Sequence, residues 1–124
     1  MGSIETKIDI PFELTVNTVK GQIVTKDVTD WLNNYYSDTV TRLILWDFRE
    51  ADLSKIKTED FREIVKDVKK ISLERVDGKT AFVVKRDFEF GIGRMMEAFG
   101  EIEKMHFESR SFRNMDDAKK WLGI

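Results

Sequence analysis

The main feature in the pattern of hydrophobic positions along this chain is one unbroken apolar run, Leu43–Trp46. A strand with one wet face alternates polar and apolar side chains, whereas an unbroken run is typical of a strand covered on both faces. The run therefore predicts a central buried strand over about 42–48. A second run, Ala81–Val84, follows the turn signal Asp77-Gly78 and predicts a second buried strand.

Three further segments have weaker strand patterns. Apolar and polar residues alternate from Phe12 to Val16, which predicts a strand with one wet face that Gly21 either ends or bends into a second extended piece. Residues 4–10 predict an antiparallel edge strand that Pro11 would end, because proline cannot donate to a ladder. Residues 107–112 predict a more polar strand at the other edge.

Four helices are predicted by apolar residues that recur at helical spacing. We expect the first from an N-cap at Thr25 to about Tyr36, the second from a cap at Thr58, the third from about Phe90, and the last from a cap at Asn114. Their buried stripes are Val28, Trp31, Leu32 and Tyr35; Phe61, Ile64, Val65, Val68 and Ile71; Ile92, Met95, Met96, Phe99 and Ile102; and Ala118, Trp121 and Leu122.

The order of these elements predicts the fold class. Strands that alternate with helices form a mostly parallel sheet covered by helices. We therefore expect an α/β protein with four or five strands in a mixed sheet and about four flanking helices. The length of 124 residues and the absence of a visible linker suit a single domain over 1–124.

Composition narrows the classes of function. The 21 basic and 23 acidic residues are spread along the chain and give a net charge of −2, which argues against a nucleic-acid footprint. No apolar run approaches the roughly 18 residues of a membrane span, and no signal peptide pattern opens the chain. The absence of cysteine excludes disulfides and thiolate metal sites. We expect a soluble, cytoplasmic protein.

Polar side chains follow both predicted central strands and form the candidate binding surface. If the strands are parallel, these residues leave the sheet at one edge, where the positive end of the third helix also lies. With neighbouring aromatic residues they would form a shallow pocket for a ligand or a partner. The alternative is that Asp47 caps or pairs with Arg94 only to hold a loop in place. The surface comprises Asp47, Arg49, Asp52, Asp87, Phe90, Gly91 and Arg94.

Other residues carry weaker signals. Gly91-Ile92-Gly93 begins like a dinucleotide fingerprint but lacks its last small residue, so we interpret the glycines as a close approach of helix to sheet. His106 is the only histidine and is expected at the surface, which leaves no metal site and no cofactor in the prediction. The methionines Met95, Met96, Met105 and Met115 are either core or an adaptable apolar surface for a ligand or a second copy.

Three local patterns carry a resemblance to a known family. They are Leu43-Ile44-Leu45-Trp46-Asp47 with Ala51-Asp52-Leu53; Phe90-Gly91-Ile92-Gly93-Arg94-Met95; and Ser111-Phe112-Arg113-Asn114 running into Ala118-Lys119-Lys120-Trp121-Leu122. This combination resembles the SpoIIAA-like family of small bacterial proteins, which is related in fold to the anti-sigma-factor antagonists and STAS domains. The resemblance implies a four- or five-stranded mixed sheet with helices packed around it.

The resemblance transfers little function. The antagonists have an Asp-Ser-Ser-Gly type motif after the central strand, and a partner kinase phosphorylates its serine. This chain has Glu50-Ala51-Asp52-Leu53-Ser54 there, without Ser-Ser-Gly. Ser54 or Thr58 remains a candidate for phosphorylation near a helix N-terminus, and the alternative is that both are loop or capping residues.

These observations lead to two main hypotheses. The first is a non-enzymatic, STAS-like binding or regulatory domain that acts through protein partners at 47–58 and 87–94, with self-association left open. The second is a carrier of a small apolar or anionic ligand in a pocket at the carboxyl ends of the central strands. A small hydrolase or transferase would depend on Asp47, Asp87 or His106 and has no motif to support it.

Overall fold

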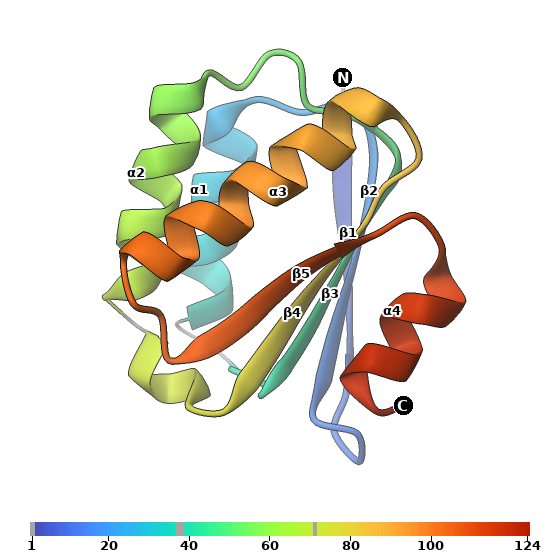
Figure 1. Cartoon of the computed structure of the whole chain (residues 1–124), viewed down its shortest axis with the longest axis vertical. Coiled ribbons are helices and arrows are strands. Elements are labelled where there is room, and N and C mark those ends of the chain that lie inside the picture. Colours follow the sequence, from blue (N-terminus) through green and yellow to red (C-terminus); the bar gives the residue numbers. More distant parts are fainter. Residues whose placement is uncertain (1, 37–38, 71) are drawn as a thin grey trace.

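The computed structural model describes residues 2–36, 39–70 and 72–124. Within them the chain forms a five-stranded sheet and helices that cover both of its faces (Figure 1). The strands are β1 (Ser3–Asp9), β2 (Leu14–Gln22), β3 (Leu43–Asp52), β4 (Gly78–Val83) and β5 (Phe107–Phe112). The helices are α1 (Thr25–Tyr36), α2 (Thr58–Lys69), α3 (Asp87–Ile102) and α4 (Met115–Leu122), with a short 3-10 helix η1 (Ser72–Arg75).

The sheet has the strand order β1-β2-β3-β4-β5. Strand β1 is antiparallel to β2, and the other neighbouring strands are parallel. Ile44 of the central strand pairs with Thr15 on one side and Thr80 on the other. The predicted mixed, mostly parallel sheet with four flanking helices is confirmed.

Two apolar cores explain the unbroken run in β3. Helices α1, α2 and α3 cover one face of the sheet and α4 covers part of the other (Figure 1). Ile44 and Trp46 point to the three-helix side, where they belong to one apolar core with Phe61. Leu45 points to the opposite side and packs with Leu122 of α4. Successive side chains of a strand point to opposite faces, so both rows of β3 are buried and both are apolar.

Strand β2 differs from its prediction. It begins at Leu14 and continues through Gly21 to Gln22, while Phe12 lies in the preceding turn with 57% of its surface exposed. The expected wet face is wrong, because Thr15 and Asn17 are fully buried. The hydroxyl of Thr15 lies 2.7 Å from that of Thr41 and is thereby satisfied inside the protein.

Strand β3 and helix α3 are both longer than their patterns indicate. Strand β3 extends to Asp52 because Glu50–Asp52 pairs with Lys20–Gln22 beyond a register shift in β2. Helix α3 begins at Asp87, three residues before the predicted start at Phe90. At its other end Ile102 is 66% exposed, so its place on the buried stripe is wrong.

Two of the three predicted caps are wrong. The hydroxyl of Thr25 donates to Asp60 of α2 at 3.0 Å, and Thr58 follows the N-cap residue Lys57 instead of capping α2 itself. The cap at Asn114 is confirmed, since its side chain accepts a hydrogen bond from the backbone of Asp117 at 2.9 Å. Ile71, predicted on the buried stripe of α2, lies outside the described residues.

Candidate functional site

A cavity lies between the sheet and helices α1, α2 and α3. Its volume is about 110 Å³, and apolar side chains from the sheet and from all three helices form almost all of its wall. The lining side chains include Ile44, Trp46, Phe82, Ile64, Val65 and Met96. An apolar wall of this kind is typical of sites for small molecules.

Two glycines of α3 contribute to this space. Gly93 and Gly100 both line the cavity, and neither fills it with a side chain. A Cβ at Gly93 would collide with Ser111 of β5, so the glycine allows α3 to lie close to the sheet, as predicted. The same prediction is wrong for Gly91, whose Cβ would meet nothing within 4 Å.

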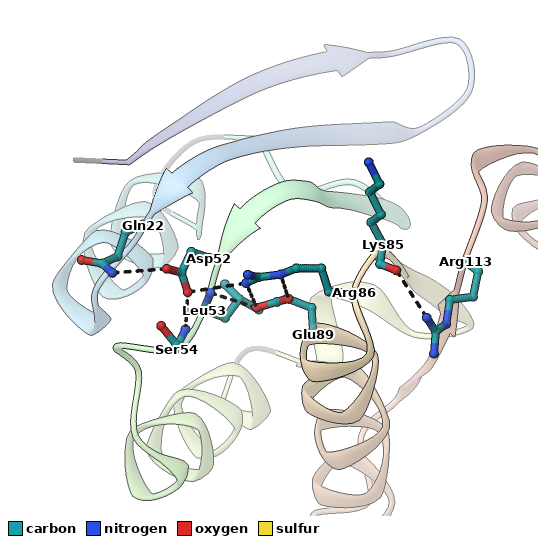
Figure 2. Close-up of polar contacts among 8 residues, drawn as sticks. All are labelled: Gln22, Asp52, Leu53, Ser54, Lys85, Arg86, Glu89 and Arg113. Carbon is teal, nitrogen blue, oxygen red and sulfur yellow. Dashed lines mark hydrogen bonds and ion pairs between the residues drawn. The ribbon is translucent and has the colours of Figure 1, made fainter.

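A buried carboxylate lines the cavity near the carboxyl ends of the strands. Glu89, in the first turn of α3, is 1% exposed. Its two oxygens accept hydrogen bonds from the guanidinium of Arg86, both at 2.7 Å, and one also accepts from the backbone N–H of Leu53 at 3.2 Å (Figure 2). These bonds satisfy the negative charge and connect the start of α3 to the end of β3.

Asp52 extends this cluster toward the surface (Figure 2). Its carboxylate accepts a hydrogen bond from the backbone N–H of Ser54 at 2.9 Å and another from the side chain of Gln22 at 3.3 Å. It also lies 3.6 Å from Arg86. The hydrogen bonds from Ser54, with that from Gln22 and the charge of Arg86, lower the pKa of Asp52 to about 2. Asp52 is therefore ionised at neutral pH.

A buried cation lines the cavity near the amino ends of β3 and β4. Arg75 is 2% exposed. Its guanidinium donates to Thr80 Oγ1 at 2.8 Å and to the carbonyl oxygens of Thr41, Arg42 and Lys79 at 3.0, 3.0 and 2.9 Å. Protein acceptors thus satisfy the charge of Arg75, as protein donors satisfy that of Glu89, and the surface between them is apolar.

The residues of the predicted binding surface do not form one site, because their charged side chains pair with separate partners. Asp47 and Arg49 lie within β3 and pair with each other at 2.8 Å, whereas Arg94 pairs with Glu97, so the alternative pairing of Asp47 with Arg94 is wrong. Burial raises the pKa of Asp47, but hydrogen bonds from Arg49 outweigh this effect and hold that pKa below its ordinary value. Asp47 follows Leu45 at a spacing of two, which directs it to the α4 side of the sheet, away from the cavity.

The remaining predicted residues lie at the start of α3. Asp87 pairs with Arg113 at 2.8 Å, and the guanidinium of Arg113 lies over the ring of Phe90 at 4.3 Å. Arg113 also donates to the carbonyl oxygen of Lys85 (Figure 2). Arg94 lies one turn further along α3 and pairs with Glu97 at 3.9 Å. Of the seven predicted residues, only Asp52 belongs to the cluster that contains Glu89.

The sequence patterns missed three charged residues at this site, namely Arg75 and Glu89, which line the cavity, and Arg86, which pairs with Glu89. For Arg86 and Glu89 a weak signal was present, because opposite charges three residues apart can pair along a helix. The predicted helix began at Phe90, so both residues lay outside it and their helical spacing was not recognised. For Arg75 the sequence has no comparable signal, since its acceptors are mostly main-chain carbonyls that only the fold brings together.

The other candidate residues lie at the surface. Ser54 and Thr58 are exposed, and their phosphorylation stays a prediction. His106 is exposed as expected. Among residues 2–36, 39–70 and 72–124, no group of three or more His, Cys, Asp or Glu side chains is placed to hold a metal ion. In that part of the chain, no helix combines the length and apolar character needed to cross a membrane.

Comparison with known proteins defines the class of fold. No protein-family model and no curated protein matches the sequence. Among solved structures, the chain is similar to an uncharacterized protein of the DUF3478 family with a SpoIIAA-like fold, from Shewanella loihica PV-4. The TM-score is 0.57 at 15% sequence identity, and the match covers 98% of this chain and 93% of the other. The protein is therefore an α/β domain with a SpoIIAA-like fold, which confirms the predicted resemblance at the level of the fold.

Proposed function

We propose that this protein is a non-enzymatic binding domain that holds a small apolar molecule between its sheet and helices α1, α2 and α3. The observation that carries the proposal is the apolar cavity of about 110 Å³. Water gains few hydrogen bonds in such a space, and side chains around a void lose dispersion contacts. An apolar molecule of suitable size would restore those contacts.

The lining favours an apolar ligand over an anionic one. Among the described residues Arg75 is the cation that lines the cavity, and its guanidinium already donates to four oxygens of the protein. An apolar engineered cavity of about 150 Å³ binds benzene or xenon, so a volume of about 110 Å³ suits a ligand of similar or smaller size. Met96 and Met105 also line the space, and their flexible side chains could adapt to a larger molecule.

A substitution that fills the cavity tests this proposal. We expect wild-type protein to bind xenon and benzene, with a rise in Tm equivalent to about 1.4 kcal/mol at a ligand concentration tenfold above Kd. Val65→Phe adds volume at a cavity-lining position that is 4% exposed, so it should abolish this rise. Thermal unfolding with and without each probe, together with amide NMR spectra, measures the effect.

The matched control is Val16→Phe. Val16 packs on the α4 side of the sheet, outside the cavity lining, so this variant should bind both probes as the wild-type protein does. Wild-type protein that shows neither an NMR shift nor a rise in Tm with either probe would contradict the proposal. Native mass spectrometry of freshly purified protein adds a search for a retained natural ligand.

A second candidate function is recognition of a protein partner at the carboxyl edge of the sheet. The observation that favours it is that two apolar side chains are exposed there, Val24 after β2 at 45% and Phe88 after β4 at 51%. We expect Phe88→Glu to lower the recovery of a specific partner from native cell extract at least tenfold, by quantitative pull-down. Ile10→Glu, on the distant β1–β2 turn, is the control and should leave that recovery unchanged. Equal recovery with Phe88→Glu would contradict this candidate.

A further inference from the structure

Strand β1 forms an open edge of the sheet. It is the first strand in the order and has a neighbouring strand, β2, on one side only. Six of its seven residues are exposed, the exception being the half-buried Ile4. A long exposed edge strand presents a row of backbone donors and acceptors that another strand can pair with.

The side chains of β1 follow a symmetric pattern around Thr6. The hydroxyl of Thr6 accepts a hydrogen bond from Trp31 of α1 at 2.8 Å and donates to Asn17 at 2.7 Å, so this side chain lies on the helix side of the sheet. Its neighbours Glu5 and Lys7 therefore point to the opposite side, where their charged groups lie 3.8 Å apart. Their side chains are 68% and 81% exposed.

We propose that β1 pairs antiparallel with β1 of a second copy of this chain, around a two-fold axis at Thr6. This register places Glu5 opposite Lys7 of the other copy, and Lys7 opposite its Glu5. On the helix side it places Ile4 opposite Ile8, which is 39% exposed in one chain. The same pattern thus matches opposite charges on one face of the joined sheet and apolar side chains on the other.

The other edge of the sheet fits a second copy less well. Glu108 and Arg110 of β5 also flank one residue, Ser109, so opposite charges could face each other there too. In that register Phe107 would face Ser111, which gives no apolar pair. Ser111 also donates to Glu97 of α3 at 2.7 Å, and α3 lies beside β5 (Figure 1). We therefore assign the contact to β1.

Charge reversal on β1 tests the contact. We expect sedimentation of wild-type protein over micromolar to millimolar concentration to show a reversible dimer. Lys7→Glu or Glu5→Lys alone turns both attractive pairs of the dimer into repulsive ones, and should raise the dissociation constant about tenfold or more. Arg110→Glu on β5 is the matched control and should leave the constant unchanged.

Two rescues identify the register. The double variant Glu5→Lys with Lys7→Glu restores opposite charges across the axis and should dimerise within about threefold of wild type. An equimolar mixture of the two single variants should form a mixed dimer, because every charge then faces its opposite. Three results would each overturn the proposal. The wild-type chain could stay monomeric throughout, or the single variants could dimerise as the wild type does. The third is loss of the dimer in Arg110→Glu alone.

Discussion

Arg75→Met is expected to lower the free energy of unfolding by about 4 kcal/mol. Methionine retains much of the apolar length of arginine but none of its donors. The variant leaves the carbonyl oxygens of Thr41, Arg42 and Lys79, in one buried and two partly buried hydrogen bonds, without the guanidinium that now donates to them. It also removes the cation that lies 4.4 Å above the ring of Phe107. Urea titration measures the loss.

Two further variants separate the geometry of Arg75 from its charge. Arg75→Lys keeps the positive charge but cannot reproduce the planar fork that serves several acceptors at once, so we expect it to lose at least about 2 kcal/mol. Arg62→Met is the control, because Arg62 is exposed on α2 and lies 5.9 Å from the ring of Phe99. It should change stability by less than about 0.5 kcal/mol. A loss below about 1 kcal/mol in Arg75→Met would show that other donors reach these carbonyls.

Glu89→Ala is expected to lower the free energy of unfolding by about 3 kcal/mol. The substitution removes both short hydrogen bonds to Arg86 and the acceptor of the Leu53 N–H, which is buried at the end of β3. Because the side chain of Arg86 is itself 56% exposed, water can solvate it after the substitution, so the loss should be smaller than that in Arg75→Met. Urea titration gives the stability.

Hydrogen exchange at Leu53 gives an independent measure of the same contact. In Glu89→Ala we expect the Leu53 amide to exchange at least about tenfold faster, since its acceptor is gone. Glu101→Ala, at an exposed position of the same helix, is the control and should change neither quantity. An unchanged exchange rate at Leu53 would contradict the role of Glu89 as the acceptor that holds this amide.

Glu89 and Arg75 have the same role in the proposed function, because each fixes the position of elements around the cavity. Glu89 and Arg75 both line the cavity and are nearly inaccessible to solvent, yet each is fixed by hydrogen bonds to other elements. They connect α3 to β3 and η1 to the amino ends of β3 and β4. A ligand between them would contact apolar side chains held in place by these two polar clusters.

Sequence patterns predicted an element correctly where the residues of that segment alone carry the information. The run Leu43–Trp46 identified the central strand because both of its faces are covered, and Phe107–Phe112 matched β5 residue for residue. Asn114 was identified as a cap because capping depends only on the next three residues. Patterns were insufficient for Thr15 and Asn17, whose burial depends on partners distant in sequence.

The candidate site shows the same division. Asp52 was identified from the sequence, but its connection to Arg86 and Glu89 depends on the true start of α3. Asp47 and Arg49 were expected at a strand end, yet β2 pairs with β3 beyond them and keeps them inside the sheet. A polar strand end such as Glu50–Asp52 has no apolar pattern of its own, so only its neighbour in space reveals it as a strand.

By itself the sequence determined the class of fold, the order of its strands and helices along the chain and most of their buried faces. The reason is that the spacing of apolar residues within one segment predicts both its secondary structure and its buried face. Only the tertiary structure decided where a cavity remains, which charges are buried beside it and which strand edge stays open. Those features depend on how side chains from separate elements fill the space between them, and no single segment contains that information.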